Sequence, residues 1–88
     1  MSDPAVVKFG AAWCGPCRMY APAFERVSNT RPGVAFISVD IDEDTEAAQR
    51  FAVSSVPTTI IVKDGQEVAR LSGAKSTSIL TRFVDDNL

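Results

Sequence analysis

Two cysteines three positions apart are the residues best suited to chemistry in this chain. Cys14 and Cys17 lie in the segment Trp13-Cys14-Gly15-Pro16-Cys17. The chain has no histidine, which excludes Cys-His nucleophiles and the common zinc hydrolases, because both need an imidazole. A structural zinc site needs about four nitrogen or sulfur ligands. Two sulfurs would suffice only if two chains shared the ion, so we expect no metal.

A redox pair explains the neighbouring residues better than a structural disulfide, which would close too short a loop to constrain the unfolded chain much. Gly15-Pro16 is typical of a helix start, because proline suits the first helical position. A cysteine just before that start meets unpaired backbone N–H groups and the positive helix end. Both lower the pKa of the thiol and favour the nucleophilic thiolate at Cys14. Cys17 lies within reach of a mixed disulfide formed there.

The elements that must position the cysteines follow the order β-α-β-α-β-β-α. A short apolar run predicts a central strand before the motif, and apolar residues at helical spacing predict a helix between Gly15 and Arg31. That spacing begins at Met19, and a similar pattern puts Ile79 on the inner face of the last predicted helix. Two strands joined by a helix favour a right-handed parallel unit. The other elements predicted are strands 5–9, 34–39, 58–63 and 67–71 and helices 43–51 and 76–87.

Length and composition indicate one globular domain spanning residues 1–88, with 45% hydrophobic and 23% charged residues. The net charge of -2 argues against nucleic acid as a partner, which requires a basic face. No apolar run approaches the roughly 20 residues of a membrane span. The opening Met1-Ser2-Asp3-Pro4 lacks the basic and apolar segments of a signal peptide. We therefore expect a cytoplasmic, reducing setting with no membrane partner.

Three aspartates alternate in the segment Asp40, Asp42 and Asp44, as at the start of a calcium-binding loop. The pattern then fails, because Thr45 stands where that loop requires glycine. We expect a solvated loop and a helix start here instead of a cation site.

The cysteine motif and several distant segments resemble the thioredoxin family. The five-residue motif is specific, and the downstream segments follow it at the family's spacing. The likeness covers the chain from Ala5 onward. The segments that carry it are Phe9, Trp13-Cys14-Gly15-Pro16-Cys17, Arg18-Met19, Ala21-Pro22, Val56-Pro57-Thr58, Asp64-Gly65, Gly73-Ala74 and the final helix ending in Leu88.

This resemblance implies a thioredoxin-like α/β fold, with a four-stranded mixed sheet and three flanking helices, and a protein-disulfide reductant. Cys14 would attack a target disulfide and Cys17 would resolve the mixed disulfide. Pro57 would be cis, which is uncommon for an X-Pro bond, and Val56 would pair its backbone with an extended substrate. For Trp13 the alternative is ordinary core packing. The substrate-binding rim implied comprises Trp13, Gly15, Pro16, Val56, Pro57, Gly73 and Ala74.

The resemblance implies no cofactor besides the redox-active disulfide. Electrons would come from a flavin- and NADPH-dependent thioredoxin reductase, and the other partners would be disulfide-containing target proteins. We expect a monomer or a weak homodimer. The alternative is a thioredoxin-like binding module, or a subunit of a larger complex, whose redox activity is incidental. A glutathione-dependent role is disfavoured by the Gly-Pro dipeptide between the cysteines.

The sequence departs from the family at Lys8, where thioredoxins usually have a buried aspartate that assists proton transfer. A lysine cannot accept a proton while it is a cation. Two roles stay open, because Lys8 could stabilise the Cys17 thiolate or extend to solvent. Only 13 residues precede Cys14, whereas thioredoxins usually open with a further strand and helix. We therefore expect strand 34–39 at a sheet edge and some apolar surface uncovered.

Overall fold

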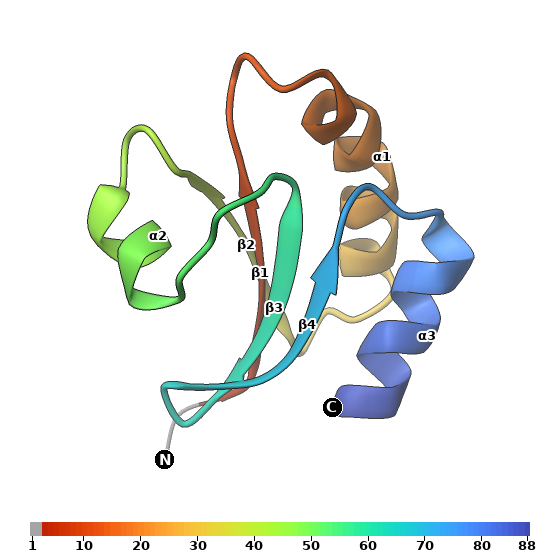
Figure 1. Ribbon diagram of the computed structural model, residues 1–88. Coiled ribbons are helices and arrows are strands. Elements are labelled where there is room, and N and C mark those ends of the chain that lie inside the picture. Colours follow the sequence, from red (N-terminus) through yellow and green to blue (C-terminus); the bar gives the residue numbers. More distant parts are fainter. Residues whose placement is uncertain (1–2) are drawn as a thin grey trace.

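Four strands form one mixed sheet in the order β2-β1-β3-β4 (Figure 1). In the computed structural model, which describes residues 3–88, β1 (Ala5–Gly10) pairs parallel with β2 (Ala35–Asp40). It pairs antiparallel with β3 (Thr58–Lys63), which pairs antiparallel with β4 (Gln66–Ser72). The predicted four-stranded mixed sheet is confirmed. Met1 and Ser2, the first residues of the predicted domain, lie outside the described residues.

Three helices flank the sheet, and the element order matches the prediction. Helices α1 (Gly15–Asn29) and α3 (Thr77–Asn87) cover one face, and α2 (Thr45–Arg50) lies on the other (Figure 1). Helix α2 begins later than the predicted 43–51 because the Asp44 carboxylate caps it, accepting a 3.0 Å hydrogen bond from the Ala47 N–H. It ends at Arg50, and Phe51 is its C-cap. Within residues 3–88, no helix is both long and apolar enough to span a bilayer.

The central strands bury both of their faces. Val6 and Ile61 pack toward α1 and α3, whereas Val7, Phe9 and Ile60 pack toward α2. Successive side chains of a strand point to opposite faces, so a strand covered on both sides reads as a nearly continuous apolar run. The predicted central position of β1 is confirmed, and Lys8 is the one charged residue in that strand.

The inner-face prediction for Ile79 was wrong, and Met19, where the apolar spacing of α1 begins, is also exposed. Met19 is 81% exposed and Ile79 is 49% exposed. Adjacent residues of a helix point about 100° apart, and the sheet buries their neighbours Tyr20 and Leu80 instead. Helical spacing defined an apolar stripe that is wider than the strip each helix presents to the sheet.

Strand β2 lies at an edge of the sheet, as expected. Ile37 pairs in register with Val7 on the face that α2 partly covers. Val7 is only 8% exposed, whereas Ile37 is 44% exposed. Helix α2 therefore leaves part of the apolar edge strand uncovered, also as expected.

Candidate active site

The cysteine pair lies where β1 gives way to α1. Cys14 is the N-cap residue of α1, with Pro16 in the first turn, and its N–H donates a 3.1 Å hydrogen bond to the Ala11 carbonyl. Cys14 and Cys17 form a disulfide with their Cα atoms 5.3 Å apart. Both side chains are buried. The short turn after the strand thus presents two sulfurs side by side at the helix N-terminus.

The helix start favours negative charge on Cys14. The backbone N–H of Cys17 donates to Cys14 Sγ at 3.2 Å, and the first turn of α1 contains no acidic residue. An N–H donor and the positive end of a helix both stabilise a thiolate relative to a thiol. The helix-start placement predicted for Cys14 is therefore confirmed. Within residues 3–88, no three His, Cys, Asp or Glu side chains are grouped to hold a metal ion.

A loop from the far side of the sheet completes the site. The Val56–Pro57 peptide bond is cis, as the family resemblance predicted. The Val56 carbonyl oxygen lies 3.8 Å from Cys14 Sγ. The Gly73 N–H donates a 2.8 Å hydrogen bond to the Pro57 carbonyl. The loop before β3 therefore lies against the sulfur pair, and a third distant segment, at Gly73, is joined to that loop.

The predicted rim residues differ in exposure. Trp13 is 67% exposed, so it does not pack in the core. Pro57 is buried and Val56 is half-buried against the cluster that contains the cysteines. Gly73 is joined to this loop by its hydrogen bond, and the exposed Ala74 follows it. Gly15 is half-buried and Pro16 is exposed.

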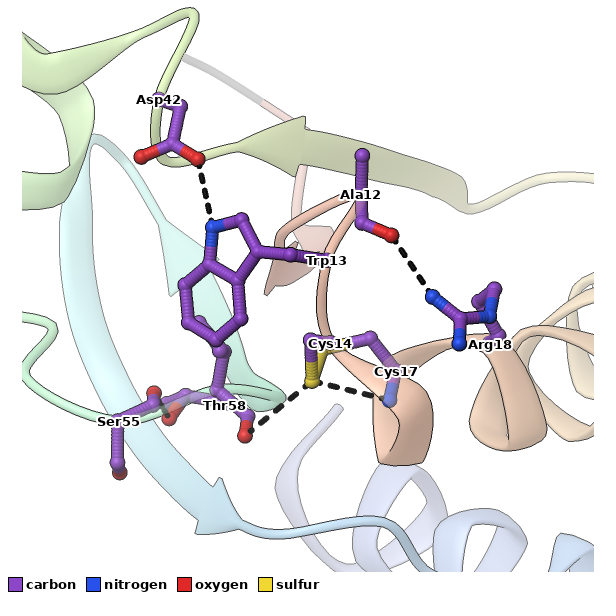
Figure 2. Close-up of a disulfide and its surroundings, with 9 residues drawn as sticks. Ala12, Trp13, Cys14, Cys17, Arg18, Asp42, Ser55 and Thr58 are labelled. Carbon is purple, nitrogen blue, oxygen red and sulfur yellow. Dashed lines mark hydrogen bonds between the residues drawn. A yellow bond between two sulfur atoms is a disulfide. The ribbon is translucent and has the colours of Figure 1, made fainter.

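Asp42 is a site residue that the sequence did not reveal. Its carboxylate accepts a 2.8 Å hydrogen bond from the indole Nε1 of Trp13 (Figure 2). Asp42 lies in the loop after β2, which the Ile41 N–H joins to the Gly10 carbonyl at 2.9 Å. Parallel β1 and β2 end at the same edge of the sheet. That shared edge was the signal that could have placed the aspartate loop beside the cysteine motif.

A cavity of about 320 Å³ borders Cys17 from the side of α1 and β2. Gly10 borders the same cavity, and a Cβ at this position would lie 3.4 Å from Cys17 Sγ. Lys8 also lines the cavity, half-buried, with its ammonium 5.0 Å from the centre of the Phe24 ring. Burial lowers the pKa of Lys8, since a low-dielectric environment disfavours the cation.

Comparisons with known proteins agree with this geometry. The thioredoxin family model matches residues 1–86. The thioredoxin of Chlamydia pneumoniae is 44% identical over 84 residues, which make up 96% of this chain and 82% of that protein. A thioredoxin of Mycobacterium tuberculosis is 43% identical over 86 residues, covering 97% of this chain and 74% of the relative.

Solved structures show the same likeness. The X-ray structure of Fasciola hepatica thioredoxin superposes with a TM-score of 0.90 at 41% identity, covering 98% of this chain and 82% of that one. Oxidised mitochondrial thioredoxin 3 of Saccharomyces cerevisiae gives a TM-score of 0.88 at 34% identity, covering 98% and 80%. The chain belongs to the thioredoxin family, and its disulfide-forming cysteine pair makes it a thiol–disulfide oxidoreductase.

Proposed function

We propose that the chain reduces disulfides of other proteins by dithiol–disulfide exchange through Cys14 and Cys17. The Cys14 thiolate attacks one sulfur of a target disulfide, and the target's second sulfur leaves as a thiolate. The Cys17 thiolate then attacks Cys14 Sγ and releases the first target sulfur. Two electrons pass to the target, and the intramolecular disulfide forms. The observation that carries this proposal is the Cys17 N–H donated to Cys14 Sγ at 3.2 Å.

The backbone beside Cys14 suits an extended substrate. Val56 places its carbonyl 3.8 Å from the attacking sulfur, and it precedes β3 at an end of the sheet. An extended peptide that paired with Val56 would bring its own sulfur toward Cys14 by the same main-chain hydrogen bonds that join strands. The exposed Trp13 would then cover one side of the bound segment. The remaining rim residues would contact the segment's side chains.

The partners in this proposal are disulfide-containing proteins and an NADPH-dependent thioredoxin reductase that restores the dithiol. The setting is the cytoplasm, where thiols are kept reduced. The chain works there as a monomer or a weak homodimer, with no cofactor other than its own disulfide.

Insulin reduction tests this function. The protein, recycled by dithiothreitol, is expected to accelerate insulin precipitation, and Cys14→Ser is expected to abolish the acceleration. Met19→Ser is the matched control, because Met19 lies on the same helix and is 81% exposed. Circular dichroism confirms that each variant is folded. Absence of reduction by the folded parent protein would overturn the proposal and favour the binding-module alternative.

A further inference from the structure

Lys8 is a half-buried cation in the middle of the sheet, and no carboxylate among residues 3–88 lies within ion-pairing distance of it. The ion pairs shown within residues 3–88 are Arg31–Asp85 and Glu67–Arg70, and neither includes Lys8. Its ammonium lies instead over the Phe24 ring. An ammonium that has lost water without gaining a counterion interacts strongly with any negative charge that forms nearby.

Cys17 borders the same cavity as Lys8, and negative charge forms on its sulfur during thiol–disulfide exchange. Both residues line the cavity of about 320 Å³ between α1 and β2. Gly10 lies beside Cys17 Sγ and follows Lys8 by two positions on the same face of β1. That separation is about 7 Å along a strand, which the long, flexible lysine side chain can span. A second hollow of about 300 Å³ borders Lys8 and Phe24, so the ammonium has room to turn.

We propose that the Lys8 ammonium stabilises the negative charge on Cys17 Sγ while Cys17 resolves the mixed disulfide. Lys8 is therefore a positioning residue that acts through Cys17. In this step, which rests on the proposed function, the Cys17 thiol gives its proton to water in the cavity. The resulting thiolate attacks Cys14 Sγ, the Cys14–target bond breaks, and the target leaves as a thiolate.

Other charged groups face the same cavities and are more exposed than Lys8. The Arg18 guanidinium, on α1, donates to the Ala12 carbonyl at 2.8 Å. Glu43 is exposed at the cavity mouth, and Glu25 is exposed beside the second hollow. Asp40 is half-buried, and its carboxylate accepts from the Asp42 N–H at 2.8 Å. Solvent screens the exposed charges strongly. Asp40 is therefore the negative charge that most opposes the stabilisation of the Cys17 thiolate by Lys8.

The pKa of the Cys17 thiol tests the proposal in the Cys14→Ser protein, which has one cysteine. Thiolate absorbance and the rate of alkylation by iodoacetamide are measured against pH for this parent protein. The same measurements are made on three variants of it, which carry in addition Lys8→Met, Lys8→Arg or Lys63→Met. Removing the cation is expected to raise the Cys17 pKa by about 0.5–1 unit. Lys8→Arg restores the parent pKa. Lys63→Met leaves the Cys17 pKa unchanged, because Lys63 is the last residue of β3, at the end of the strand away from the cysteine pair.

An unchanged Cys17 pKa in folded Lys8→Met would overturn the proposal, and so would a failure of Lys8→Arg to restore it. If Lys8→Met does not fold, salt provides the second test. Raising the ionic strength is then expected to raise the Cys17 pKa of the parent, because screening weakens the attraction to Lys8. A Cys17 pKa that falls or stays constant with salt contradicts the idea. These measurements need no target protein, so their outcome is separate from that of the insulin assay.

Discussion

The indole Nε1 of Trp13 donates a 2.8 Å hydrogen bond to the carboxylate of Asp42, 29 positions further along the chain. The indole is 67% exposed, so packing alone does not fix the direction of the ring. Figure 2 shows the bonded ring beside the cysteine pair. The loop after β2 therefore orients a side chain of the loop after β1, at the surface where a target would bind.

Removing the Asp42 carboxylate is expected to weaken target binding. Without it the ring adopts several orientations, and fixing one of them on binding costs about 0.5–1 kcal/mol, the net value of a typical hydrogen bond. The kcat/KM for insulin reduction by Asp42→Ala should therefore fall by about two- to fivefold, mainly through KM. The control Asp86→Ala removes an exposed carboxylate from α3. Equal kinetics in the two variants would contradict this role for Asp42.

The local part of the site could be predicted from the sequence, because its causes lie within a few residues. Gly15-Pro16 marks the helix start, and the cap position of Cys14 follows from it. The boundaries of β3 were also predicted, since its β-branched run is bounded by Pro57 and the Asp64-Gly65 turn. Such features need no knowledge of the rest of the fold.

The long-range part could not be read from local patterns. The cis bond before Pro57 was expected only from the family resemblance, since trans is the default for an X-Pro bond. The exposure of Met19 and Ile79 depends on how each helix is rotated against the sheet. The contact of Asp42 with Trp13 depends on the parallel pairing of β1 with β2. Each of these is set by elements distant in sequence.

A buried hydrogen bond joins α1 to β3 below the active site. Tyr20 Oη and Thr59 Oγ1 lie 2.7 Å apart, and both side chains are almost fully buried. Tyr20→Phe leaves the Thr59 hydroxyl without this partner, which is expected to cost about 1–2 kcal/mol of unfolding free energy. Urea unfolding measures the loss. Adding Thr59→Val should recover part of it, since both polar groups are then absent; a further additive loss would show that the bond is unimportant.

The same tyrosine makes the unfolding free energy depend on pH in the alkaline range. Burial raises the pKa of Tyr20, and the hydrogen bond to Thr59 opposes that rise. Above the ordinary tyrosine pKa of about 10, the unfolded chain therefore loses this proton before the folded one. The unfolding free energy falls from that pH up to the raised pKa of the folded state. Tyr20→Phe lacks this decline.

Comparing the unfolding free energy of the parent protein with that of Tyr20→Phe at each pH separates the contribution of Tyr20 from that of Lys8. The pKa of Lys8 is lowered by burial, so the folded chain loses the lysine proton first. This makes the unfolding free energy rise with pH, below the ordinary lysine pKa of about 10.4. Lys8 is present in both proteins and cancels in their difference. A constant difference between parent and Tyr20→Phe from pH 8 to 11 would refute the assignment.

Two glycines of the site are expected to respond oppositely to alanine. Gly73 has φ +88, a conformation that disfavours a Cβ, so Gly73→Ala should lower the unfolding free energy by about 1–2 kcal/mol. Gly10 is a strand residue, and its added Cβ would make van der Waals contact with Cys17 Sγ. Gly10→Ala should raise stability by about 0.4–1 kcal/mol, because alanine restricts the unfolded chain. Urea unfolding of the oxidised proteins measures both changes. A lower unfolding free energy in Gly10→Ala would mean that the cavity cannot accept a methyl group.

Cys17→Ser is expected to trap the protein on its target. Cys14 Sγ accepts the Cys17 N–H and lies beside the Val56 backbone, so it is the sulfur placed to attack. Serine keeps that N–H but cannot displace the target, and the mixed disulfide persists. Mixing with a disulfide-containing protein, quenching with acid and running non-reducing electrophoresis should show a covalent adduct. Cys14→Ser should show little adduct, because Cys17 faces the cavity behind the site. Stronger trapping by Cys14→Ser would reverse the roles of the two cysteines.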